Sequence, residues 1–240
     1  YVLCGRDGPP DSFWDILPAY GWLAIPAAFI LKQPDLGTTM VIIVIITGIL
    51  YFAGASGRLI FSLVALALVF IIALLLLHFY AGLPLPIEEH WINRFESVFN
   101  PEKDPLGTGY QVLQSKIAIG SGTLWGKGIG RGTQNRLEFI PEQQTDFIFS
   151  VVGEELGFVR TIGVLGVYVF LLYRNLLSAL ESPDKEGTLI AGGVLTMLLF
   201  QILVNTGMTM GIMPVTGIPL PFLSYGGTAL VVNAFSIGLV

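Results

Sequence analysis

The sequence has few charged residues, almost no cysteine and no cluster of basic residues. Only 12% of its 240 residues are Asp, Glu, Lys or Arg, and the formal net charge is -5. A chain without a basic arm or a Lys/Arg run lacks the electrostatic footprint of nucleic-acid binding, so we exclude that class of partner. Its single cysteine, Cys4, cannot form an internal disulfide.

A nucleotide-binding motif is also missing, although glycine is abundant. Six glycines crowd residues 120–132, yet the pattern GxxxxGK followed by Ser or Thr does not occur. Lys127 and Arg131 lie in this stretch, where they could counter the charge of a lipid diphosphate. The alternative is that both simply meet the phosphates of the surrounding membrane lipids.

What the sequence has in abundance is apolar residues, at 53%, with a mean hydropathy of +0.75. This is too apolar for a soluble domain of this size. Because the chain begins at Tyr1 and ends inside an apolar run, we expect it to be truncated at both ends. We predict an all-α polytopic membrane protein with one domain, residues 1–240, and with spans at 16–31, 38–55, 59–77, 162–177, 188–204 and, unfinished, from 228.

The distribution of basic residues predicts which side each loop faces. If the spans alternate, the short loops on one side hold Arg58, Arg174 and Lys185, and those on the other hold only Lys32. The positive-inside bias then makes the first side cytoplasmic. The long stretch 79–161 is therefore predicted to be an extracytoplasmic loop.

Asp146 is the strongest candidate for a functional residue. It lies in residues 141–149, where a polar loop runs into an apolar span, and ionisable groups at such a boundary are by default a functional-site hypothesis. The alternative is a solvated anionic loop. If Pro141 begins the helix, Glu142 and Asp146 share one face and Glu155 points away from it. That face continues in the small residues Ser150, Gly153 and Gly157.

Several motifs carry a resemblance to a known family. They are QPDLGT at 33–38, NPEKDPLGTGYQ at 100–111, QSKIAIGSG at 114–122, WGKG at 125–128, PEQQTDFIF at 141–149, GEELGF at 153–158 and PLPFLSYGG at 219–227. Together they resemble the SEDS family of peptidoglycan glycosyltransferases, the RodA/FtsW/SpoVE group. The resemblance covers nearly the whole chain from about residue 16.

The resemblance implies a fold of about ten helices, of which this chain holds roughly the last six. Members polymerise lipid II, a polyprenyl-diphosphate-linked disaccharide-pentapeptide, and work with a class B penicillin-binding protein in the bacterial cytoplasmic membrane. Thr216 stands where division-type members usually have a lysine, which favours the elongation type. The chain departs from the family at Thr123 and Arg160, where glycine is usual.

The resemblance also implies roles for particular residues. Asp146 would be the general base that activates a sugar hydroxyl for an inverting transfer. Lys116 is the first candidate for stabilising the diphosphate leaving group, followed by Lys127 and Arg131. Glu138 matches a functionally important family acid, and we expect it to hold a divalent cation, Mg or Mn, or to orient the acceptor. Glu142 would lie next to the residues that contact the substrate and help to hold them in place.

Three other functions stay open from the sequence. The chain could belong to a lipid II flippase or transporter, with Asp35, Asp146 and Glu154 as a relay. It could be a non-catalytic scaffold that recruits the penicillin-binding protein. A lipid-linked sugar ligase of the O-antigen type shares the chemistry but lacks the sequence match.

Overall fold

The computed structural model describes residues 8–33, 35–81, 94, 107–136 and 139–240, and this part of the chain is helical without strands. Four of its helices, α1, α3, α7 and α8, are long and apolar enough to cross a membrane, and α2 and α9 are shorter apolar helices. The predicted all-α polytopic fold is thereby confirmed. The helices are α1 (Phe13–Leu31), α2 (Leu36–Phe52), α3 (Gly57–Ala81), α5 (Thr108–Ser121), α6 (Thr133–Arg136), α7 (Ile148–Glu181), α8 (Lys185–Thr209) and α9 (Gly227–Gly238).

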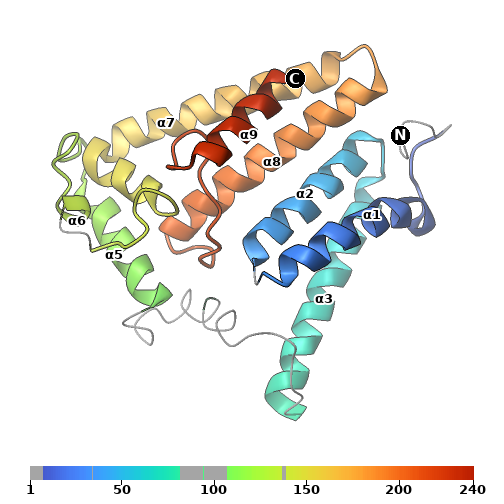
Figure 1. Ribbon diagram of the computed structural model, residues 1–240, viewed down its shortest axis with the longest axis horizontal. Helices are drawn as coiled ribbons and strands as arrows, with labels where there is room; N and C mark the ends of the chain where they lie inside the picture. Colours follow the sequence, from blue (N-terminus) through green and yellow to red (C-terminus); the bar gives the residue numbers. More distant parts are fainter. Residues whose placement is uncertain (1–7, 34, 82–93, 95–106, 137–138) are drawn as a thin grey trace.

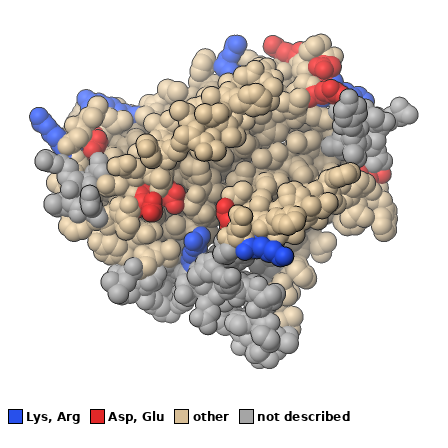
Figure 2. Space-filling model, in the orientation of Figure 1, with Lys and Arg blue, Asp and Glu red and all other residues tan. Residues whose placement is uncertain are grey.

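Helix α8 is the centre of the arrangement. It contacts α7 along one side and α2 along the other, and α1 packs on α2 (Figure 1). The short helix α5 packs against α7 and also reaches α8, whereas α3 projects away from the rest. Charged side chains gather toward the two ends of the α7–α8 pair and leave an uncharged surface between them (Figure 2). This distribution is the one expected of helices that cross a membrane.

Small residues let α2 and α8 approach closely. A side chain at Gly48 of α2 would collide with Thr196 of α8, and one at Gly192 would collide with Phe52. A side chain at Gly193 would make a tight contact with Ile49, at 3.1 Å. Because lipid tails are as apolar as the helices, such close packing is what drives helices together in a membrane.

The start of α2 is fixed by Asp35. Its Oδ1 accepts from the Thr38 amide at 2.9 Å and its Oδ2 from the Thr38 hydroxyl at 2.6 Å, which satisfies the first turn of the helix. Within the same first turn, Gly37 lies against the backbone carbonyl of Thr216. The beginning of α2 therefore lies beside the segment that follows α8.

Helix α7 is broken at Gly157, whose φ of 76° and ψ of 176° are not helical. The break deprives backbone groups on both sides of their helical partners, and such groups are costly in a membrane. Residues 123–128 of the glycine-rich loop supply the replacements. Lys127 N and Gly128 N donate to the carbonyls of Glu154 and Glu155, and Phe158 N and Val159 N donate to the carbonyls of Thr123 and Leu124.

Candidate active site

Asp146 lies in a turn directly before α7. The amides of Asp146 and Phe147 both donate to the carbonyl oxygen of Glu142, at 3.1 Å each, and α7 begins only at Ile148. The prediction that Pro141 starts the helix is therefore wrong, although the bond from Asp146 N to Glu142 O still places these two residues one turn apart. Residues 141–147 form consecutive turns, and the carbonyls of Gln144, Thr145 and Asp146 bond to other segments rather than to the next helical turn.

Three successive backbone carbonyls of this turn accept hydrogen bonds from α8 or from the segment that follows it, residues 210–226. The bonds are Tyr225 N to Gln144 O at 2.8 Å, Ser224 Oγ to Thr145 O at 2.6 Å and Asn205 Nδ2 to Asp146 O at 2.9 Å. Each donor thus satisfies a carbonyl that the turn itself leaves open. The turn before α7 and the segment after α8 are consequently held as one unit.

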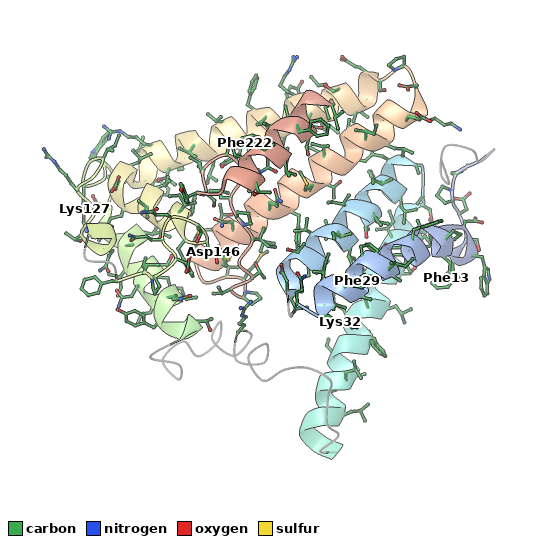
Figure 3. The ribbon with its side chains drawn as sticks, viewed as in Figure 1. Phe13, Phe29, Lys32, Lys127, Asp146 and Phe222 are labelled. Atoms are coloured by element: carbon green, nitrogen blue, oxygen red, sulfur yellow. The ribbon has the colours of Figure 1, made fainter. Side chains whose placement is uncertain are left out.

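The surroundings of the Asp146 carboxylate come from the same unit (Figure 3). Gly217 has a φ of +74°, and a Cβ at this position would lie 3.4 Å from Asp146 Oδ2. A positive φ of this size favours glycine. On the other side of the turn, Phe147 is fully buried in a cluster with Val112 of α5 and Met208 of α8. Packing therefore fixes the residue after Asp146 while the carboxylate itself stays half-buried.

The electrostatics make Asp146 a better proton acceptor than an ordinary aspartate. Burial raises the pKa of its carboxyl above 3.8, and the neighbouring Glu142 carboxylate raises it further. The Thr145 hydroxyl and the Arg94 guanidinium act in the opposite direction without cancelling the rise. A raised pKa matches a base to working pH more closely. Sequence reasoning gave Arg94 no role.

Lys116 lies on α5 at the end of α8. Its Cε and Nζ occupy the space that a side chain at Gly211 would take, and Gly211 has a φ of +69°. The neighbouring Ser115 hydroxyl donates to the carbonyl of Thr209 at 2.8 Å, which joins the two helices there. The Lys116 side chain is exposed, so its charge is available at the C-terminal end of α8, where a cation is favoured.

Lys127 is held in an ion pair with Glu154. The Lys127 Nζ lies 2.6 Å from Glu154 Oε1, and the two side chains are 27% and 1% exposed. The same oxygen accepts from the amides of Thr133 at 2.8 Å and Gln134 at 3.1 Å. Glu154 therefore clamps the glycine-rich loop onto α7, and Lys127 already has an anionic partner.

Glu155 completes this clamp. Its Oε2 accepts from the amide of Gly130 at 3.0 Å, and its side chain is buried. The sequence predicts that Glu155 points away from the Asp146 face, and in the structure its side chain contacts the glycine-rich loop, which folds back over α7. Arg131, by contrast, is exposed at the surface of the same loop.

The remaining acidic candidates lie at the outer side of the turn. Glu142 is exposed, and its Oε2 accepts from the Thr145 hydroxyl at 3.0 Å. Glu138 lies outside the described residues. Within the described part of the chain, no three acidic, His or Cys side chains gather in a cluster that could hold a metal ion. The described residues thus do not form a complete cation site by themselves.

Two residues that sequence reasoning missed are Asn205 and Ser224, which hold the turn. Asn205 ends an apolar run of α8, and a polar side chain in such a run is a signal that could have marked it. Ser224 lies in the PLPFLSYGG motif at 219–227, but a single serine there gives no signal of its partner in the turn.

Comparison with known proteins identifies the family. The sequence profile of the FtsW/RodA/SpoVE cell cycle proteins matches residues 6–240. The chain is 42% identical over 237 residues to peptidoglycan glycosyltransferase MrdB of Escherichia coli K12, covering 98% of this chain and 61% of that protein. It is 36% identical to the probable peptidoglycan glycosyltransferase FtsW of Nitrosomonas europaea, covering 100% of this chain and 60% of that protein. The chain therefore belongs to the FtsW/RodA/SpoVE family, and it spans about three fifths of the length of these curated relatives.

Solved structures agree with this assignment. A chain from a study of structural coordination of polymerization and crosslinking by a peptidoglycan synthase complex matches with a TM-score of 0.75 at 30% identity, covering 99% of this chain and 63% of that one. An aspartate-to-alanine mutant of the rod shape determining protein RodA of Thermus thermophilus matches with a TM-score of 0.61 at 29% identity, covering 99% and 58%.

Proposed function

We propose that the full-length protein is a peptidoglycan glycosyltransferase that polymerises lipid II into glycan strands during cell elongation. The observation that carries this proposal is Asp146, a half-buried carboxylate with a raised pKa, in a turn whose carbonyls are held by α8 and by the segment after it. Relatives over almost the whole chain are named peptidoglycan glycosyltransferases.

The proposed reaction joins two sugars and inverts the anomeric carbon. A hydroxyl of the acceptor sugar attacks the anomeric carbon that bears the diphosphate, and its proton passes to a carboxylate oxygen of Asp146. The new glycosidic bond forms as the bond to the diphosphate oxygen breaks. The diphosphate leaves as an anion, so it needs a nearby cation rather than a proton.

Lys116 is the first candidate for that cation. It is exposed at the end of α8, and Arg131 is exposed on the glycine-rich loop. Lys127 supports the leaving group less directly, because its ammonium is paired with Glu154. Within the proposal, Lys116 and Arg131 bind the diphosphate, and Lys127 keeps the loop in place.

The proposed setting is the bacterial cytoplasmic membrane, with residues 79–161 outside and lipid II in the outer leaflet. A class B penicillin-binding protein is the proposed partner, because a structural neighbour comes from a complex described as coordinating polymerization and crosslinking. Membrane lipids cover the apolar helices. These features rest on the family resemblance and on the loop charges.

A divalent cation, Mg or Mn, is a further part of the proposal. Glu138 and Glu142 are the carboxylates that would approach it, and a bound cation would help neutralise the leaving diphosphate. No step of the proposed reaction depends on it here. Chelation with EDTA followed by return of Mg or Mn, in the assay below, tests its contribution.

The test of the proposed function is Asp146→Asn in the full-length protein, assayed for glycan-strand formation from lipid II. We expect a loss of about 10²–10⁴ in rate, because the amide keeps the shape but cannot accept the proton. The variant should unfold at the same or a slightly higher temperature at neutral pH. A carboxyl with a raised folded-state pKa stabilises the fold only at low pH, and that stability is lost as pH rises.

Glu186→Gln is the matched control, since it removes an exposed carboxylate at the start of α8 and should leave the rate unchanged. Near wild-type polymer from Asp146→Asn would rule out Asp146 as the base. The transporter and scaffold functions would then have to be reconsidered.

A further inference from the structure

Asn205 is a fully buried amide with two backbone acceptors. Its Nδ2 donates to the carbonyl of Asp146 at 2.9 Å and to the carbonyl of Ile218 at 2.8 Å. Both hydrogens of the amide nitrogen are thereby used. A flipped amide would turn its oxygen toward two carbonyl oxygens, so the contacts fix the orientation of the side chain.

The two carbonyls belong to different parts of the site. One is the backbone of Asp146 itself, and the other belongs to the 210–226 segment, so one side chain of α8 ties both to the same helix. Ser224 makes a second connection between them. Its hydroxyl donates to Thr145 O at 2.6 Å and accepts from Leu220 N at 2.7 Å.

This network acts directly on the orientation of the carboxylate. The carbonyl that Asn205 holds is bonded to the Cα of Asp146, so rotating that peptide group moves the Cβ and the carboxylate with it. The 210–226 segment also places Gly217 beside the carboxylate, where an added Cβ would lie 3.4 Å from Asp146 Oδ2. Loss of either donor would let the turn and the segment move apart. A misplacement of about 1 Å at a reacting group can cost about 10²-fold in rate.

We infer that Asn205 and Ser224 are positioning residues that set the Asp146 carboxylate for proton transfer, through the backbone carbonyls of Thr145 and Asp146. The inference rests on the proposed function, since it assumes that Asp146 is the base. Neither side chain needs to touch the substrate for this role, so their removal changes kcat more than KM.

The experiment measures lipid II polymerisation by the full-length protein with Asn205→Leu, Ser224→Ala or Ser224→Thr. Leucine has a similar size to asparagine but donates no hydrogen bond. We expect Asn205→Leu to lower kcat by about 10²-fold while KM changes by less than about twofold. Ser224→Ala should lower kcat by about tenfold, because it frees the neighbouring carbonyl and leaves that of Asp146 bonded. Ser224→Thr keeps the hydroxyl and should restore kcat.

Thr206→Val is the control for a purely structural effect. Thr206 is buried beside Asn205 on α8, but its hydroxyl donates only within the helix, to Ile202 O and Leu203 O. It should leave kcat unchanged. A kcat for Asn205→Leu within about twofold of wild type, or an equal fall in Thr206→Val, would overturn the inference.

Hydrogen exchange of the full-length protein separates this inference from the proposed function. Asn205→Leu should speed amide exchange at Asp146 and Phe147, which donate within the turn, and Thr206→Val should not. If wild type made no polymer from lipid II, the proposed function would fail, and the exchange rates would still decide the positioning role. Unchanged exchange in Asn205→Leu would overturn that role.

Discussion

At the scale of single residues, Glu142 determines how Asp146 responds to pH. Its carboxylate is the second largest cause of the raised Asp146 pKa, after burial. As pH falls through that pKa, Asp146 takes up a proton and no longer serves as a base. The acid limb of the activity profile therefore lies at a higher pH than for an ordinary aspartate.

We predict that Glu142→Gln moves this acid limb to lower pH. The amide removes the negative charge that disfavours ionised Asp146, yet its side-chain oxygen can still accept from Thr145. The measurement is kcat/KM against pH for both proteins, with Glu186→Gln as the control. An unmoved or rising limb would show that Glu142 does not act on Asp146 through its charge.

Thr123 occupies a backbone conformation that suits glycine. Its φ is +51°, in the left-handed region, where a β-branched side chain is strained by about 1–2 kcal/mol. This position is also where the chain departs from the usual family glycine. The carbonyl of Thr123 nevertheless accepts from Phe158 across the break in α7, so the conformation is required.

Thr123→Gly should therefore raise the free energy of unfolding, by about 1 kcal/mol. Ser178→Gly, in the regular part of α7, should lower it by about 0.5–1 kcal/mol. Thermal unfolding of both variants in the same detergent provides the comparison. A loss of stability in both would mean that the strain at Thr123 is relieved in another way.

At the scale of elements, the glycine-rich loop and α7 depend on each other. The loop replaces the backbone hydrogen bonds that the break at Gly157 removes, and Glu154 and Glu155 hold the loop from beneath. A side chain at Gly157 would collide with Gly126. Gly122, Gly126 and Gly157 thus allow close approach between loop and helix.

Glu154→Gln should loosen the loop while α7 stays folded. The substitution removes the anionic partner of Lys127 and weakens the bonds from Thr133 and Gln134, at a cost of about 1–3 kcal/mol. Faster trypsin cleavage after Lys127 and Arg131, with unchanged helix content by circular dichroism, is the expected result. Glu186→Gln should cleave like wild type, and equal cleavage of Glu154→Gln would argue against the clamp.

At the scale of the whole molecule, the arrangement puts the candidate site at one end of α8. The Asn205 end meets Asp146, whereas the Lys185 end lies a full helix away. The transporter reading needs Asp35, Asp146 and Glu154 as a relay. Asp35 instead caps α2, and Glu154 is paired with Lys127. Of the three carboxylates, those of Asp35 and Glu154 thus have structural roles, and only that of Asp146 has none assigned to it.

The two ends of α8 should face opposite sides of the membrane. In a cysteine-free background, Thr108→Cys should react with a membrane-impermeant thiol reagent in intact cells, and Glu186→Cys should react only after the membrane is opened. The reason is that residues 79–161 carry the active site proposed to face outside the cell. The loop with Lys185 carries the basic charge that is typical of cytoplasmic loops. The reverse pattern of labelling would place Asp146 on the cytoplasmic side and end the proposed reaction with extracytoplasmic lipid II.

The sequence alone determined the class of fold, and it was enough to predict Asp146 as the candidate catalytic carboxylate. Long apolar runs leave a chain few choices other than membrane helices, and a carboxylate beside such a run is conspicuous because it is costly there. Both features are local, so composition and order along the chain reveal them. The ends of the spans at Leu31 and near Phe52 follow from the same local signals.

Only the tertiary structure decided how the site is held. The helix expected from Pro141 gives way to a turn, since Tyr225, Ser224 and Asn205 bond to its carbonyls from far along the chain. The burial of Glu155 has the same cause, a loop folding back onto α7. Local sequence patterns cannot specify such partners, because these hydrogen bonds depend on which segments the packing of α5, α7 and α8 brings together.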